Sequence, residues 1–191
     1  MNKSENRGSF VVLSGPSGVG KTLFVKRALK EYPQFKNTVT YTTRAPREGE
    51  KPGEYYYFVD SKQFEKFIKE GKFVEFAEVH GELYGTSHDE VCRIWKEKKT
   101  IIKDLDIQGA ESIKKSYPQS LTLFIYPPNM EVLKERLEKR GVQDTNNLEK
   151  RLVSARKEIA KGRLYDFKIV NDNFEEAWQE FKKIIEKSNV L

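Results

Sequence analysis

Cysteine is almost absent from this 191-residue chain, which contains Cys92 alone, and histidine occurs only twice. A single cysteine excludes a disulfide within the chain and a cysteine-rich metal site, and it suggests a reducing compartment. No apolar run reaches membrane-spanning length, and the polar first residues, MNKSENRGS, lack the pattern of a signal peptide. We therefore expect a cytoplasmic protein that has no membrane partner.

Long basic runs are missing as well, although the formal net charge is +6. The lysines and arginines are mixed with glutamates along apparent helices, so the positive excess indicates an anionic partner without favouring nucleic acid. We expect no nucleic-acid partner.

Short apolar runs that alternate with helical patterns are what the sequence does contain. Strand-like runs are expected at residues 10–14, 37–41, 55–59, 72–79, 100–106, 121–126 and 167–171. The alternation predicts an α/β fold whose core is a parallel sheet flanked by helices. Ser61 is expected to cap a helix that Gly71 ends.

The segment GPSGVGKT follows the first expected strand and precedes a helix. It matches the pattern G-x-x-x-x-G-K-[ST], in which backbone N–H groups cradle phosphate oxygens at a helix N-terminus. The predicted ATP-binding residues here are Gly15, Pro16, Ser17, Gly18, Val19, Gly20, Lys21 and Thr22. Lys21 is suited to the β and γ phosphates, and the Thr22 hydroxyl is suited to Mg²⁺.

A second polar segment, TYTTRAPREGEKPGEYYYF, gathers two arginines and three consecutive tyrosines between residues 40 and 58. Arg44 and Arg47 could bind a phosphate, because guanidinium groups form paired bonds with its oxygens. The segment alone does not identify the ligand.

Four segments, TTRAPREGEKPGEYYYF, FVEFAEVHGELYGTS, DLDIQG and VND, occur in this order and resemble guanylate kinase from residue 10 to about residue 185. The resemblance implies a single guanylate kinase-like domain, about residues 8–187. Its core, a parallel sheet of the P-loop NTPase type, would comprise residues 1–39, 91–130 and 164–191, with a small mixed α/β GMP-binding lobe at 40–90 and a helical lid at 131–163. The implied reaction is ATP + GMP ⇌ ADP + GDP, with Mg²⁺ as cofactor and a monomer or homodimer as the functional form.

The resemblance also implies a GMP site. Arg44 and Arg47 would hold the GMP phosphate together with the hydroxyl groups of Tyr56 and Tyr84, whereas Tyr55 and Tyr57 would only pack. Glu75 would accept hydrogen bonds from guanine N1–H and the exocyclic amine, Thr40 and Thr86 would bond near O6, and Asp104 and Asp106 would lie by the base and the metal. Asp104 and Thr22 are the expected metal residues, directly or through water.

For ATP and the transferring phosphates, the resemblance implies further residues. Asn171 and Asp172 would lie near the adenine, and Arg136, Arg140 and Arg151 would reach the phosphates when the lid closes. With Lys21 and Arg44, these arginines form the expected catalytic set. One position departs from the family pattern, because Lys103 stands where an apolar residue is usual, on the strand face of Ile101 and Leu105. The sequence offers no physical reason for it.

Two alternatives differ from this function. A kinase of phosphorylated sugars would share the P-loop but would have no need of Glu75 and the two threonines for guanine. A non-catalytic guanylate-kinase-like scaffold would bind peptides, and such domains have a degraded P-loop, whereas the loop here is intact.

Overall fold

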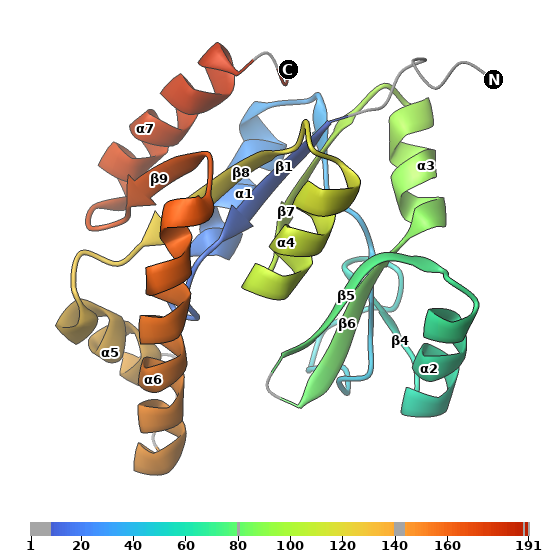
Figure 1. The fold of residues 1–191 in the computed structure, drawn as a ribbon, viewed down its shortest axis with the longest axis horizontal. Coiled ribbons are helices and arrows are strands. Elements are labelled where there is room, and N and C mark those ends of the chain that lie inside the picture. Colours follow the sequence, from blue (N-terminus) through green and yellow to red (C-terminus); the bar gives the residue numbers. More distant parts are fainter. Residues whose placement is uncertain (1–8, 80, 140–143, 189, 191) are drawn as a thin grey trace.

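A five-stranded parallel sheet forms the centre of the protein (Figure 1), as seen in a computed structural model that describes residues 9–79, 81–139, 144–188 and 190. The strand order is β2-β7-β1-β8-β9, with β1 in the middle. The strands span Phe35–Lys36 (β2), Thr100–Asp104 (β7), Phe10–Ser14 (β1), Leu121–Tyr126 (β8) and Phe167–Val170 (β9). The predicted parallel sheet is confirmed.

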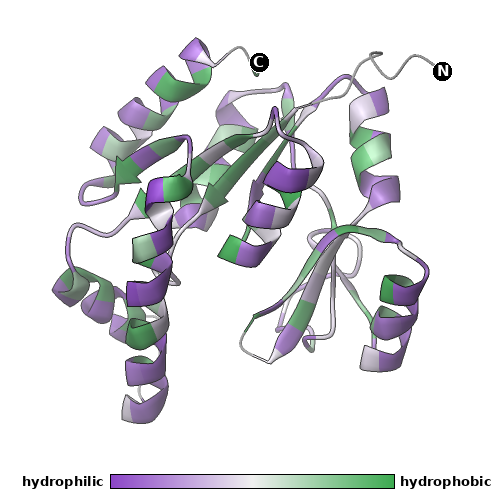
Figure 2. Ribbon diagram, in the orientation of Figure 1, coloured by the Kyte–Doolittle hydropathy of each residue, from purple (hydrophilic) through white to green (hydrophobic). Residues whose placement is uncertain are grey.

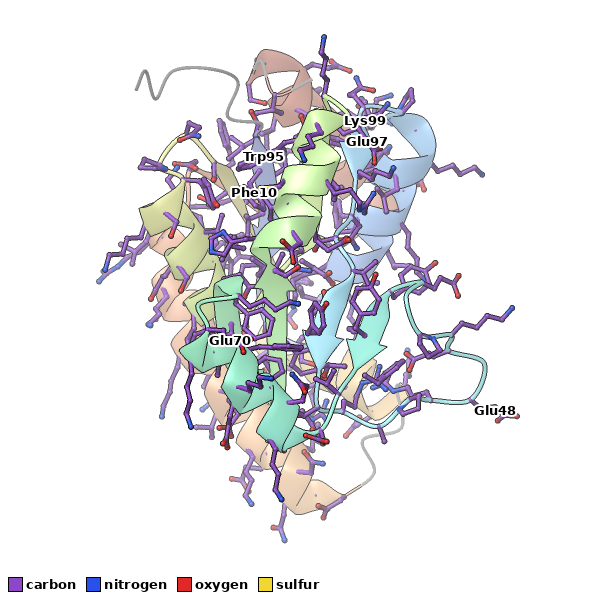
Figure 3. All side chains as sticks on the ribbon, turned by 90° about the vertical axis from the view of Figure 1, so that its right-hand side faces the viewer. Phe10, Glu48, Glu70, Trp95, Glu97 and Lys99 are labelled. Carbon is purple, nitrogen blue, oxygen red and sulfur yellow. The ribbon has the colours of Figure 1, made fainter. Side chains whose placement is uncertain are left out.

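Helices cover both faces of this sheet, because side chains along a strand point alternately to its two faces. On β1, Val11 and Leu13 belong to a core with α1 (Lys21–Glu31) and α7 (Phe174–Lys187). Phe10 and Val12 belong to a second core with α3 (His88–Lys96) and α4 (Ile107–Ser116). The rings of Phe10 and Trp95, both labelled in Figure 3, meet edge to face at 5.5 Å. Figure 2 shows the same division, with hydrophobic strands inside and hydrophilic helix surfaces outside.

A smaller lobe is built on a four-stranded mixed sheet of order β4-β3-β6-β5. Its strands span Tyr56–Phe58 (β4), Thr40–Thr42 (β3), Glu82–Ser87 (β6) and Phe73–Val79 (β5), with α2 at Ser61–Lys69. The expected cap at Ser61 is wrong, because Asp60 is the N-cap and accepts a 2.7 Å hydrogen bond from the Gln63 N–H. Asp60 has extended backbone angles, as an N-cap residue does, and Ser61 is already helical.

Strand β6 was not expected from the sequence, where residues 81–87 look like a connection. It pairs antiparallel with both β5 and β3. Gly85 interrupts its side-chain pattern for a packing reason, since a Cβ there would come within 2.9 Å of the Phe73 ring and 3.0 Å of the Phe64 ring. A glycine in a strand often marks such a close approach.

The charged segment after β8 forms two helices, α5 (Met130–Lys139) and α6 (Thr145–Lys161), followed by the 3₁₀ turn Gly162–Leu164. They share a small core of Leu133, Leu137, Leu148 and Ala155. In Figure 1 both parts lie below the central sheet, with α5 and α6 at the lower left and the smaller lobe at the lower right. No helix in the described ranges combines the length and apolar character needed to cross a membrane.

Packing of the smaller lobe gives a stability prediction. Phe64 is fully buried and its ring stacks on Phe73 at 4.7 Å, whereas Phe76 in the same lobe is 45% exposed. Phe64→Ala should cost about 3–5 kcal/mol, which lowers Tm by at least roughly 6 °C in a chain of this size. Phe76→Ala is the matched control and should change Tm by less than about 2 °C. Thermal unfolding followed by circular dichroism measures both, and equal shifts would contradict this account of the lobe.

Candidate active site

The phosphate-binding loop leaves the end of β1 with three glycines at positive φ: Gly15 at 142°, Gly18 at 87° and Gly20 at 102°. Gly15 has a steric reason as well, because a Cβ there would lie 2.3 Å from the backbone oxygen of Ile125. The loop curls around Lys21, whose Nζ donates to the backbone oxygens of Gly15 and Pro16. The lysine is thus held at the centre of the loop.

A later segment of the chain supports this loop from behind. Asn171 is buried, and its Nδ2 donates a 2.8 Å bond to the backbone oxygen of Val19. Arg136 on α5 donates to the backbone oxygens of Asn171 (2.8 Å) and Asp172 (3.1 Å). Asn171 therefore braces the P-loop backbone, and Arg136 connects α5 to the same segment.

Two groups suited to a metal ion meet at the start of α1. The Thr22 hydroxyl donates a 2.9 Å hydrogen bond to Asp104 Oδ2 at the end of β7. The described residues include no group of three histidine, cysteine or acidic side chains placed to hold a metal. Mg²⁺ commonly keeps several waters and binds one or two protein oxygens together with phosphate, so this pair fits that ion.

Asp106 has a different role from Asp104, although both were expected by the base and the metal. Its side chain is the N-cap of α4 and accepts a 2.8 Å bond from the Gly109 N–H. Burial raises the pKa of the Asp106 carboxyl, and the backbone N–H groups of Gly109 and Gln108 oppose this shift.

Glu50 organises the arginine segment, a role not expected from the sequence. Its carboxylate accepts bonds from Arg44 Nη2 at 2.9 and 3.0 Å and from the Arg47 backbone N–H at 2.7 Å. The hydrogen bond from the Arg47 backbone lowers the pKa of Glu50. A carboxylate therefore fixes the direction of Arg44 before any phosphate is bound.

The three consecutive tyrosines have different surroundings. The guanidinium of Arg44 lies 5.1 Å from the Tyr56 ring centroid, and the rings of Tyr56 and Tyr84 are 6.3 Å apart. Tyr57 instead packs on Tyr41 at 4.9 Å, and Tyr55 is half exposed. The structure thus brings together Arg44, Tyr56 and Tyr84.

Buried polar side chains gather where the smaller lobe meets the core. Thr40, Glu75, Thr86 and Lys103 are each less than 10% exposed. Thr86 donates its hydroxyl hydrogen to Glu75 Oε1, and Lys103 Nζ donates to Thr38 Oγ1 (2.7 Å) and Thr40 Oγ1 (2.5 Å). Glu75 also approaches α4, since a Cβ on Gly109 would lie 2.9 Å from its Oε2.

Charges of opposite sign offset each other in this cluster. Burial raises the pKa of the Glu75 carboxyl, while the charge of Lys103 and the bond from Thr86 oppose that rise. Burial lowers the pKa of the Lys103 ammonium, against the charges of Glu75, Asp104 and Glu90. Burying either charge alone would be far more costly, so each one makes the other tolerable.

The remaining predicted residues lie apart from these contacts or cannot be described. Arg151 on α6 bonds Asn147 Oδ1 at 3.1 Å, one turn away on the same helix. Arg140 lies outside the described residues. Sequence reasoning missed Glu50 and Gly109 as parts of the site, and it singled out Lys103 without a reason.

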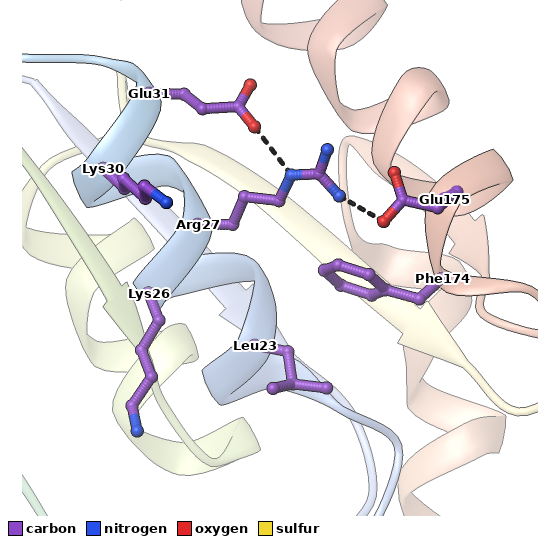
Figure 4. A pocket seen from close by; sticks show the side chains of 7 residues that line it. All are labelled: Leu23, Lys26, Arg27, Lys30, Glu31, Phe174 and Glu175. Atoms are coloured by element: carbon purple, nitrogen blue, oxygen red, sulfur yellow. Dashed lines mark hydrogen bonds and ion pairs between the residues drawn. The ribbon is translucent and has the colours of Figure 1, made fainter.

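A hollow of about 500 Å³ between α1 and α7 lies elsewhere (Figure 4) and is lined by Leu23, Lys26, Arg27, Lys30, Glu31, Phe174 and Glu175. Arg27 is paired there with Glu31 and Glu175, and it lies over the ring of Trp178 at 4.9 Å. None of the predicted site residues lines this hollow, so it is not the candidate site.

Comparisons with known proteins agree with the geometry. The family model for guanylate kinase matches residues 7–188. The guanylate kinase of Bdellovibrio bacteriovorus is 44% identical over 176 residues, which is 92% of this chain and 95% of that protein. Guanylate kinase 1 of Oryza sativa is 42% identical over 92% of this chain, which spans only 47% of that longer protein. The crystal structure of guanylate kinase from Anaplasma phagocytophilum superposes with a TM-score of 0.75 at 31% identity, covering 96% of this chain and 87% of that one. The chain belongs to the guanylate kinase family.

Proposed function

We propose that this protein transfers the γ-phosphoryl group of ATP to GMP, giving ADP and GDP, at the site between the P-loop and the smaller lobe. Membership of the guanylate kinase family supports ATP-dependent phosphorylation of GMP. The observation that carries the assignment of the site is the 2.9 Å bond between Thr22 and Asp104, which joins the P-loop helix to the strand end beside the buried polar cluster. A cytoplasmic location accords with the single cysteine.

The donor side would be formed by the P-loop. Its backbone N–H groups and Lys21 would hold the β and γ phosphates of ATP. Thr22 and Asp104 would hold Mg²⁺, which supplies positive charge to the phosphate oxygens. Asn171 would act by keeping the loop in shape, since its side chain bonds Val19, and Asp172 would complete the segment near the adenine.

The acceptor phosphate would bind to Arg44 and Arg47, with the Tyr56 and Tyr84 hydroxyls. A guanidinium has five N–H donors, and the bonds to Glu50 come from one Arg44 nitrogen, Nη2. Arg44 Nη1 also donates to the backbone oxygen of Ala45 at 2.7 Å. Glu50 and Ala45 would therefore orient Arg44 while its remaining N–H groups face the phosphate. Charge-assisted bonds of this kind are the strong ones.

In the reaction, an oxygen of the GMP phosphate forms a bond to the γ phosphorus, and the bond from that phosphorus to the bridging oxygen of ADP breaks. The nucleophile is already an anion, so no general base is required. Catalysis consists of positioning and of neutralising charge on the transferring group. Lys21 and Arg44, with Arg136, Arg140 and Arg151 from the lid, are the proposed residues for that neutralisation.

Glu75 would recognise the guanine base by accepting hydrogen bonds from it. Guanine presents N1–H and an exocyclic amine side by side, and both can donate to one carboxylate, whereas adenine presents an unprotonated N1. Thr86 would hold the carboxylate in place, because its hydroxyl already donates to Oε1. Thr40 would bond the O6 side of the base, and Asp106 would position α4 behind it.

Release of ADP in a coupled assay tests this function directly. With ATP and Mg²⁺ present, GMP should be phosphorylated, whereas AMP and ribose phosphates should give little turnover. Turnover with a sugar phosphate and none with GMP would instead support the sugar-phosphate kinase, and no turnover with any acceptor would support a non-catalytic scaffold.

Glu75→Gln should reduce kcat/KM for GMP by about 10-fold to 100-fold, because one carboxylate acceptor is replaced by an amide that faces the guanine donors. AMP use should change far less, so the GMP-to-AMP ratio of kcat/KM should narrow. Arg44→Lys is the control for phosphate binding and should weaken both nucleotides alike. An unchanged GMP-to-AMP ratio in Glu75→Gln would remove Glu75 from the base site.

Gly109→Ala tests the close approach of Glu75 to α4. The added Cβ would lie 2.9 Å from Glu75 Oε2, the mobile end of a side chain, so the carboxylate should move while the fold is kept. Alanine also favours the helix over glycine by about 0.8 kcal/mol, so Tm should not fall. We expect kcat/KM for GMP to fall several-fold with the KM for ATP unchanged. A lower Tm with unaltered GMP kinetics would show that Gly109 serves packing alone.

A further inference from the structure

Lys103 is a lysine inside the protein, on strand β7 of the five-stranded core sheet. Only 4% of it is exposed, and its ammonium donates hydrogen bonds to two threonine hydroxyls, Thr38 Oγ1 at 2.7 Å and Thr40 Oγ1 at 2.5 Å. Thr40 lies on β3 of the smaller lobe. The lysine thus joins the core sheet to the strand that carries one of the proposed base contacts.

The direction of these bonds is fixed by chemistry. An ammonium group has three N–H donors and no acceptor, and a hydroxyl has one hydrogen to donate. The Thr40 oxygen therefore accepts from Lys103, and its own hydrogen must point elsewhere. Among the described residues (9–79, 81–139, 144–188 and 190), the Thr40 hydroxyl donates no hydrogen bond. Its hydrogen is therefore available to a ligand.

We propose that Lys103 is a positioning residue that holds the Thr40 hydroxyl as a hydrogen-bond donor to the bound base, and so selects a purine with a carbonyl at C6 over one with an amino group. This inference rests on the proposed GMP site. A 6-oxo group accepts the bond from Thr40. A 6-amino group could bond Thr40 only through the second lone pair of its oxygen. It would then lie beside the ammonium of Lys103 and would leave the Thr40 hydrogen without an acceptor.

The same ammonium also acts on the second base contact. It offsets part of the charge of Glu75, which is 5% exposed and has to remain a carboxylate to accept two N–H bonds. Asp104 and Glu90 are the other acidic groups whose charges act on Lys103. One buried cation therefore supports both the acceptor at Glu75 and the donor at Thr40.

The test compares GMP with 2,6-diaminopurine ribonucleoside monophosphate, which keeps the 2-amino group but has an amino group at C6 and no N1 hydrogen. Lys103→Met has a similar length without the ammonium. Because it leaves Glu75 buried without its cation, it should lower Tm, so the kinetics are measured well below the Tm of the variant. In wild type, kcat/KM should favour GMP strongly. Lys103→Met should raise the KM for GMP about tenfold, narrow the ratio between the two nucleotides by a similar factor, and leave the KM for ATP and the kcat for GMP nearly unchanged.

Thr40→Val completes a double-mutant cycle with Lys103→Met, since neither nucleotide can bond a hydroxyl at position 40 in this variant. If Lys103 acts through Thr40, adding Lys103→Met to Thr40→Val should change the nucleotide ratio clearly less than Lys103→Met does in wild type, because only its effect on Glu75 is then left to lose. Thr38→Val removes the other hydroxyl bonded to the same ammonium and should leave the ratio at its wild-type value. An equal effect of Lys103→Met with and without the Thr40 hydroxyl would overturn the proposal.

Lys103→Gln is a second variant in case the methionine variant does not fold. Its neutral amide both donates and accepts, so Thr40 loses its fixed role and the ratio should again narrow. A folded Lys103→Gln or Lys103→Met variant with a wild-type ratio overturns the proposal, and a change in Tm alone would show a purely structural lysine. A wild-type protein that does not phosphorylate GMP would overturn the proposed function itself, which is a different result.

Discussion

Burial of β1 on both faces and along both edges is the constraint on which the rest of the site depends. The strand has β7 and β8 as parallel neighbours and one hydrophobic core on each face. Ligands of such sheets bind beyond the carboxyl ends of the strands. The P-loop therefore follows a fully buried strand in the middle of the sheet, and Thr22 meets Asp104 because β7 ends beside β1.

Opposite charges buried together form the second organising element. Lys103 and Glu75 come from the core sheet and the smaller lobe, and each carries a desolvation cost that the other offsets. A purely apolar contact between the core and the smaller lobe would avoid the cost of desolvating two charges. It would provide neither the acceptor nor the donor proposed for the base. The arginine segment follows the same logic nearer the surface, where Glu50 orients Arg44.

Much of this architecture could be predicted from the sequence, because the responsible patterns are local. The P-loop, the strands around it and the last helix all follow from short apolar runs, glycines and helical spacing. The choice between Asp60 and Ser61 as cap could not, since either side chain can cap a helix and only the backbone angles decide. Strand β6 was not predicted because it forms by pairing with β3 and β5, and its own residues do not indicate that pairing.

Lys103 shows the same limit at the site. Its place on the strand face of Ile101 and Leu105 was predictable, but the threonines that accept its hydrogen bonds lie 63 and 65 positions away. The roles of Arg140 and the domain boundaries stay predictions, as do the individual ligand contacts. Glu50 was not predicted because, in sequence, a carboxylate near two arginines is typical of a charged surface loop. Its contacts with Arg44 and Arg47 depend on the conformation of that loop.

The bond between Asn171 and Val19 joins positions 152 residues apart. A chain that emerges from the ribosome exposes its P-loop early, yet the side chain that braces that loop follows β9, after nearly all of the sheet has been made. Partly synthesised chains therefore contain the phosphate-binding residues without their support. The loop that follows the first strand of the sheet is thus completed by a residue that follows the last strand.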